Sequence, residues 1–444
     1  MTATLVPSQA PPLTRPARDP SYEFARREAD VVARFPSGKR VPVTRERVRA
    51  YPGLTGAAPS TLAFYQAFAP LLQGRHVLDA GTGSGAGARV LSEHAPHVTA
   101  VDSDARALAF AREYAPSVDF LHADLCHGTS VDRADAAFLV DVLGHLARPE
   151  AALRGLRACL PVGSQLFVAE PRAYASQRLL APACRAFSRP ALSRLLLRAG
   201  FEVDTPLTPS TNFVALIARR AVDPSVDALA EGLYQSARGQ FSGAAKELAR
   251  ARHSARADVQ LEALLGEAEL SLAEGDGDGA VRRYFEANEL DNGDGRALSG
   301  LAHIALRTGN KDDALRLALD ALKREPTELS ANAAMAIAAE QLSHPDAFNA
   351  WRVAANLAPH DLDVAAGLAR VSAARGNFAF AIQVFERLRG YGAALGMEFH
   401  VTLGWLLLAD GRKRDASVEA RFAAVIAPES EAVTELVQAI ETPQ

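Results

Sequence analysis

Cysteine and long apolar runs are scarce in this 444-residue sequence. Its three cysteines, Cys126, Cys159 and Cys184, are odd in number and lie far apart. This spacing fits neither a disulfide framework nor a zinc site, and it predicts a reducing, cytoplasmic location. No run of about 18 apolar residues occurs, so no membrane span is expected. The formal net charge of -4 gives no strong field, so neither nucleic acid nor a membrane surface is an expected partner.

Lysine is nearly missing from the first half, where Lys39 is the only one before residue 246. This part of the chain therefore has no phosphate-loop lysine after a glycine loop and no Tyr-x-x-x-Lys pair of the dehydrogenase type. Neither a Gly-x-Ser-x-Gly nucleophile elbow nor a His-Glu-x-x-His zinc helix is present. Nucleotide hydrolysis, serine hydrolysis and zinc proteolysis are therefore disfavoured, and no metal site is expected.

The first half alternates between two kinds of pattern. Residues 1–20 are rich in proline and are predicted to be disordered. From 21 to 219, short apolar runs alternate with amphipathic helical stretches, which predicts a parallel sheet with crossover helices. The final runs, 201–206 and 212–220, are separated by a short turn, so the last strand is predicted to be antiparallel. The basic stretch 34–49 is predicted to belong to an N-terminal helical arm or lid of this domain. The other expected strands cover residues 76–80, 98–102, 118–124, 136–141 and 164–171.

The second half contains an internal repeat. One alanine recurs at intervals of 33 to 36 residues, and a glycine stands five residues before it in every copy but the fourth; the alanines are Ala244, Ala280, Ala314, Ala347, Ala381 and Ala416. This pattern predicts antiparallel helix pairs with glycine turns, which bury their apolar faces by stacking. It resembles the tetratricopeptide repeat. The resemblance implies, after a linker at 220–225, an all-α solenoid over 226–444, with about six copies, a capping helix at 429–441 and a protein partner.

The stretch HVLDAGTGSGAG, residues 76–87, has glycine at four alternate positions directly after an apolar run and an acid. It follows a predicted strand and precedes a predicted helix. In that context glycines permit a tight turn and a close approach of backbone amides to a ligand at the helix N-terminus. The stretch also satisfies a dinucleotide-binding pattern, so the loop alone does not identify the ligand.

Three aspartates follow three predicted strands. Asp79 stands two residues before the first glycine, where it would repel a pyrophosphate but attract a positively charged ligand. Asp102 is placed to accept the hydroxyls of a ribose, and Asp124 to accept the amine of an adenine. Each acid taken singly is equally typical of a helix N-cap or a solvated strand end.

With these motifs, residues 60–219 resemble the class I S-adenosylmethionine-dependent methyltransferases. The resemblance rests on VLDAGTGSG, VTAVDSD, LHADL, the segment from Asp141 through Pro161-Val162-Gly163, and LSRLLLRAGFEVDT. It implies an α/β Rossmann-like fold with a mostly parallel seven-stranded sheet and S-adenosyl-L-methionine as cofactor. The implied cofactor-binding residues are Asp79, Gly81, Thr82, Gly83, Gly85, Asp102, Ser103, Asp124, Leu125 and Asp141.

The catalytic assignment stays open. Asp141 and His145 are four residues apart, so on a helical turn they would share a face, and either is a candidate general base. The alternative for His145 is a pocket wall or helix cap. Glu170 is a second candidate for substrate contact, and the segment 172–191 is expected to shape the pocket for an unidentified methyl acceptor. A competing hypothesis is a non-enzymatic repeat scaffold carrying a cofactor-binding or degenerate methyltransferase module.

Overall fold

The computed structural model describes residues 31–34, 40–43, 59–127, 131, 133–146, 148–172, 185–206, 213–389 and 396–442. The predictions for residues 1–20, for Cys184 and for most of the segment 172–191 lie outside these residues. Within the basic stretch 34–49, β2 (Arg40–Val43) pairs in antiparallel fashion with β1 (Val31–Arg34), so the helical arm predicted here is wrong for these residues. Two compact units are present: the first holds the sheet and the chain as far as Asp291, and the second begins at Asn292.

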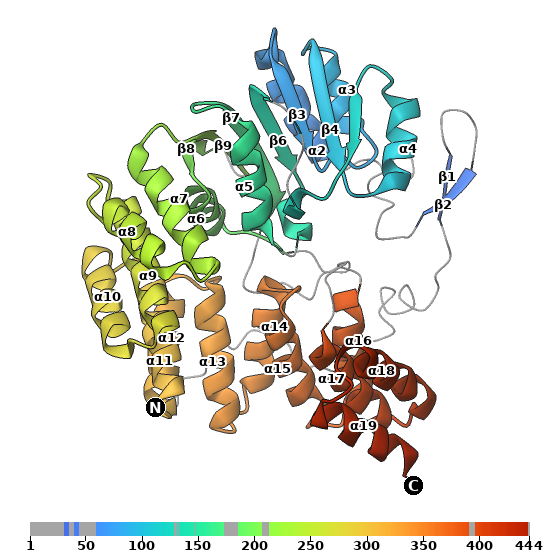
Figure 1. Ribbon diagram of the computed structural model, residues 1–444, viewed down its shortest axis with the longest axis vertical. Helices are drawn as coiled ribbons and strands as arrows, with labels where there is room; N and C mark the ends of the chain where they lie inside the picture. Colours follow the sequence, from blue (N-terminus) through green and yellow to red (C-terminus); the bar gives the residue numbers. More distant parts are fainter. Residues whose placement is uncertain are drawn as a thin grey trace. The chain divides into compact units, whose positions relative to one another are not determined.

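A seven-stranded sheet forms the centre of the first unit (Figure 1). Its order is β5-β4-β3-β6-β7-β9-β8. The strands from β3 to β7 run parallel, whereas β9 runs antiparallel to both β7 and β8. The predicted mostly parallel sheet and its antiparallel last strand are thus confirmed. The strands are β3 (His76–Ala80), β4 (His97–Asp102), β5 (Asp119–His122), β6 (Ala136–Val140), β7 (Gln165–Pro171), β8 (Phe201–Pro206) and β9 (Phe213–Arg220).

Helices cover both faces of this sheet, so its central strands are apolar on both sides. All five residues of β6 are buried, and the Phe138 ring stacks on Phe167 with centroids 4.6 Å apart. Tyr65, from the helix that precedes the sheet, also stacks on Phe138, at 5.3 Å. The helices that flank the sheet are α2 (Pro59–Phe68), α3 (Ala86–Ser92), α4 (Ala105–Tyr114), α5 (Pro149–Cys159) and α6 (Arg189–Arg198).

Within the described residues, the second half forms six helix pairs and one further helix. The repeating alanines are all buried, as close helix packing requires. The fourth pair departs from the glycine rule, since Ser343 takes the left-handed conformation (φ 53°) that glycine adopts in the other turns. The helices are α7 (Pro224–Ala237), α8 (Phe241–Arg252), α9 (Ala257–Glu274), α10 (Gly277–Leu290), α11 (Arg296–Arg307), α12 (Lys311–Arg324), α13 (Leu329–Gln341), α14 (Ala347–Leu357), α15 (Leu362–Ala373), α16 (Phe378–Arg389), α17 (Met397–Ala409), α18 (Lys413–Ile426) and α19 (Glu431–Glu441).

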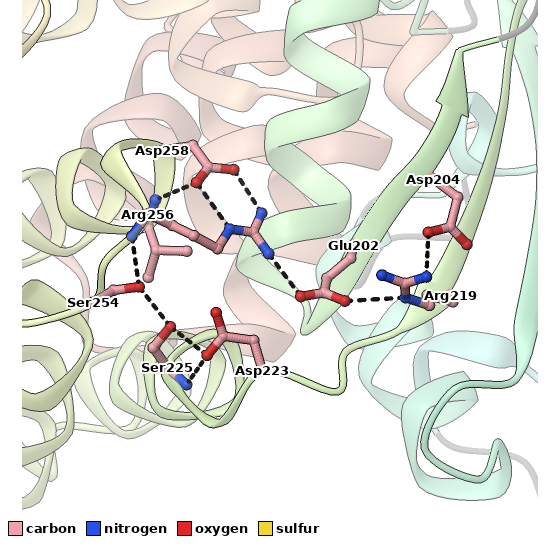
Figure 2. Close-up of polar contacts among 9 residues, drawn as sticks. Glu202, Asp204, Arg219, Asp223, Ser225, Ser254, Arg256 and Asp258 are labelled. Carbon is pink, nitrogen blue, oxygen red and sulfur yellow. Dashed lines mark hydrogen bonds and ion pairs between the residues drawn. The ribbon is translucent and has the colours of Figure 1, made fainter.

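The first repeat helices pack directly onto the α/β fold. Glu202 of β8 accepts hydrogen bonds from Arg219 of β9 at 3.2 Å and from Arg256, at the start of α9, at 2.6 Å (Figure 2). Arg198 of α6 contacts Glu262 of α9 at 3.1 Å, and that carboxylate is only 2% exposed. Because these ion pairs join the sheet and α6 to α9, the helices α7–α10 belong to the same compact unit as the α/β fold.

Candidate functional site

The loops that follow β3, β4, β5 and β6 gather at the carboxyl edge of the sheet. The strand order reverses between β3 and β6, because the chain goes from β3 outward to β4 and β5 and then returns to β6. Open α/β sheets bind ligands at such a switch point, outside the carboxyl ends of the strands. The predicted site residues therefore come from the edge of the sheet at which a ligand is expected.

The four alternate glycines serve two purposes. Gly81, Gly83 and Gly85 have positive φ angles of 81°, 55° and 83°, which side chains rarely tolerate. A methyl group on Gly81 would also lie 2.5 Å from the side chain of Val142, so this loop touches the turn after β6. Gly87 has no such φ; a methyl group there would lie 2.3 Å from the Tyr65 ring. The last glycine thus makes room for a tyrosine.

Asp79, the last but one residue of β3, is fully buried at the base of the glycine loop. Its Oδ1 accepts a hydrogen bond from the Tyr65 hydroxyl at 2.7 Å. Its Oδ2 is buried and makes no hydrogen bond of standard geometry, nor does the hydroxyl of Thr82. Burial raises the pKa of Asp79 to about 6, against the neighbouring Thr82 hydroxyl, the Tyr65 hydroxyl and the Ala88 amide, which lower it. Oδ2 therefore keeps acceptor capacity for a further donor or a cation.

Asp102 ends β4 and fastens the glycine loop to it. Its Oδ2 accepts the Gly83 amide at 2.7 Å, and its Oδ1 accepts the Asp104 amide at 2.8 Å. The amides of Gly81 and Thr82 donate to the carbonyl of Val101. The loop amides that sequence reasoning assigned to a ligand are therefore largely engaged with β4, and Asp102 itself helps to shape the loop.

Asp124 follows β5 and caps the short 3-10 helix η3 (Leu125–His127). Its Oδ1 accepts the Cys126 amide and its Oδ2 pairs with the His127 imidazole, each at 2.8 Å. Its limited burial would raise the pKa, but the hydrogen bonds from Cys126 and His127 outweigh that and lower it. Leu125 is buried, and the Ser103 carbonyl contacts His122 Nε2 at 3.0 Å. Asp124 is half-exposed and binds groups of its own turn. Of the three acids, it therefore gives the weakest indication of a ligand.

The turn after β6 carries Asp141 and His145. Asp141 has a positive φ of 59°, which is costly for a residue with a side chain. Its Oδ1 lies 3.6 Å from His145 Nε2, with both side chains partly exposed. The two side chains therefore lie on one face of the turn, as expected, with Asp141 just before the 3-10 helix η4 (Leu143–His145) and His145 at its end.

Two residues take roles that the sequence did not reveal. Tyr65 reaches Asp79 from α2, although no motif links them. Glu170, weighed as a substrate contact, is fully buried and accepts hydrogen bonds from the amides of Val142, Leu143 and Gly144. Both act on groups far away in the sequence, so a local pattern offers no signal for either.

The model of a methyltransferase domain family matches residues 57–205, and that of a tetratricopeptide repeat family matches residues 271–340. The chain carries a methyltransferase domain and tetratricopeptide repeats. No curated protein matches it. Within the described part of the methyltransferase and repeat domains, no helix is long and apolar enough to cross a membrane.

Solved structures resemble separate portions of the chain. A Burkholderia thailandensis 1,6-didemethyltoxoflavin-N1-methyltransferase with bound S-adenosylhomocysteine is 22% identical, with 37% of this chain and 80% of that chain covered and a TM-score of 0.32. An amino pentose methyltransferase from Micromonospora echinaspora, bound to S-adenosylmethionine, is 20% identical over 37% and 90%, with a TM-score of 0.30. For pilF from Pseudomonas aeruginosa the identity is 15%, the coverage 48% and 96%, and the TM-score 0.41.

Proposed function

We propose that the methyltransferase domain binds S-adenosyl-L-methionine and transfers its methyl group to an acceptor still to be identified. The buried carboxylate of Asp79 carries this proposal. A buried carboxylate whose Oδ2 makes no hydrogen bond of standard geometry, at the base of a glycine loop and at the switch point, fits the ammonium group of the cofactor's methionine portion. The neighbouring Thr82 hydroxyl would serve the same end of the ligand.

The other acids would hold the nucleoside portion. Each carboxylate oxygen has two lone pairs, so Asp102 retains acceptor capacity for ribose hydroxyls beyond the two amides that it already binds. Ser103 adjoins it. Asp124 and the Leu125 amide would face the adenine, as the family resemblance implies. The glycine loop contributes shape and close approach rather than many free amide donors.

The cofactor brings an activated methyl group with its own leaving group, so the protein has chiefly to align the acceptor for in-line attack. Asp141 and His145 lie at the turn that abuts the glycine loop. If the acceptor is a hydroxyl or an acidic carbon, this pair can take up its proton, His145 as base with Asp141 orienting it. An amine acceptor that is already neutral would need the pair only for positioning.

Calorimetric titration of the full chain with S-adenosylhomocysteine tests the proposal. We expect binding by the wild type, and Asp79→Asn and Asp102→Ala should each weaken it at least tenfold. Asp320→Ala, at an exposed surface ion pair of α12, is the matched control and should leave the affinity unchanged. Absence of binding by the wild type would refute cofactor use, and equal affinities for all four proteins would refute the assignment of Asp79 and Asp102 to the cofactor site.

The repeat domain would hold a protein partner, either the acceptor itself or a protein that presents it. A scaffold function without catalysis is the second candidate. One observation favours it: Asp102 and Asp124 already accept hydrogen bonds from backbone amides of the loops, so folding alone could require them. Cofactor binding without methyl transfer to any captured partner would support that candidate.

A further inference from the structure

Glu170 lies near the end of β7 and is fully buried. Its Oε1 accepts the amides of Val142 and Leu143 at 3.0 and 2.8 Å, and its Oε2 accepts the amide of Gly144 at 3.1 Å. Three consecutive backbone N–H groups therefore converge on one carboxylate. The mechanism above does not use this group, yet burying a carboxylate is costly unless its interactions repay it.

These three amides belong to the turn that carries both candidate catalytic side chains. Asp141 enters the turn with a positive φ, a conformation that persists only when its surroundings impose it. Its amide donates to the Ala169 carbonyl at 2.8 Å, so neighbouring residues of β7 hold both ends of the bend. The side chain of Val142 in turn sets how closely the bend approaches Gly81. The position of Glu170 thus determines one wall of the proposed cofactor site.

The charges around Glu170 make its hydrogen bonds to the three amides sensitive to protonation of the carboxylate. Burial, and after it the negative charge of Asp141, raise the pKa of Glu170, the three amides lower it, and the net result is a pKa of about 7. Among the described residues, no cationic side chain forms an ion pair with Glu170. A neutral carboxyl group accepts hydrogen bonds less strongly, and its own O–H would face an amide N–H.

We propose that Glu170 is a positioning residue whose ionised carboxylate holds the Asp141–His145 turn against the glycine loop and thereby couples cofactor affinity to pH. This inference rests on the proposed function. It predicts that the cofactor site is best formed above neutral pH and loosens when Glu170 takes up a proton. Ordinary structural capping would predict a constant contribution at all pH values at which the protein is folded.

The test compares S-adenosylhomocysteine affinities of the full-length wild type and Glu170→Gln at pH 6 and pH 8. Glutamine keeps the size but places an N–H2 group against a backbone donor. At pH 8 we expect the variant to bind at least tenfold more weakly; at pH 6, where the wild type is mostly protonated, the ratio should fall below threefold. The effects of Asp79 and of the histidines are shared by both proteins and cancel in this ratio. Glu93→Gln, at an exposed acid after α3, should match the wild type at both pH values.

A second variant keeps Glu170 itself intact. Asp141→Asn removes the negative charge that raises the pKa of Glu170, so the pH midpoint of S-adenosylhomocysteine binding should move to lower pH. A Glu170→Gln to wild-type ratio that is the same at pH 6 and pH 8 would overturn the inference while leaving the proposed function standing. An unmoved midpoint in Asp141→Asn would also overturn it. If the wild type fails to bind at every pH, the proposed function falls and this inference falls with it.

Discussion

Replacing Asp79 with asparagine should stabilise the cofactor-free protein at neutral pH. Folding raises the pKa of this carboxyl from 3.8 to about 6, chiefly through burial. A difference of about two pKa units corresponds to about 3 kcal/mol. The native state therefore holds the proton more tightly than the unfolded chain, so stability falls as the pH rises from about 4 to 6. Above pH 6 the full cost of the buried charge is present in the wild type, and the Asp79→Asn variant would not carry it.

The pKa of about 6 already includes the stronger hydrogen bond that the ionised carboxylate accepts from Tyr65. No further correction for that bond applies, so we expect a gain of about 3 kcal/mol at pH 7.5. At pH 4 the gain should vanish. Replacing a ligand-binding group commonly stabilises the ligand-free protein and weakens its affinity for the ligand.

Hydrogen exchange of the β3 segment 76–80, followed by mass spectrometry at several pH values and corrected for intrinsic rates, measures this difference locally. Both tryptophans of the chain, Trp351 and Trp405, lie in the repeat domain. Their fluorescence therefore supplies an internal control that the substitution should leave unchanged. A difference between wild type and Asp79→Asn that is independent of pH, or a variant that is less stable at pH 7.5, would refute the reasoning.

Two further substitutions test the packing. Gly87→Ala should lower the thermal midpoint, at a cost of about 1–3 kcal/mol, because the new methyl group meets the Tyr65 ring. The control Gly277→Ala has open space at its position and should be neutral or slightly stabilising. Equal effects of the two substitutions would contradict the packing argument. Arg198→Ala removes an ion pair of the buried Glu262 and should cost about 3 kcal/mol, measured by urea unfolding of the full chain. Arg250→Ala, which removes an exposed pair on α8, should cost less than about 1 kcal/mol, and similar losses in both variants would be the contrary result.

The sequence predicted the sheet and the repeats because each rests on a periodic signal. Apolar runs that end in an acid marked the strands that lead to Asp79 and Asp102, and buried alanines marked the helix crossings. The short helix η3 was not predicted, because three residues are too few to show a period. The hydrogen bonds of Glu170 could not be predicted either, because a side chain that binds amides 26 to 28 residues away leaves no local sequence pattern. The repeat pattern did flag the fourth turn, but only the structure shows Ser343 in the glycine conformation.

The acids after the strands show why a helix-cap interpretation and a ligand interpretation need not exclude each other. A carboxylate can accept about four hydrogen bonds, and the amides of Gly83 and Asp104 use one at each oxygen of Asp102. What separates the acids is the cost of leaving capacity unused. Water can satisfy the half-exposed Asp124, whereas the fully buried Asp79 keeps an oxygen that makes no hydrogen bond of standard geometry, with only the Thr82 hydroxyl and the Ala88 amide to offset its charge beside Tyr65. A charge left in that state is expensive for folding alone, so a bound cation is the simplest reason to retain Asp79. The cofactor assignment therefore depends most on Asp79, less on Asp102 and least on Asp124.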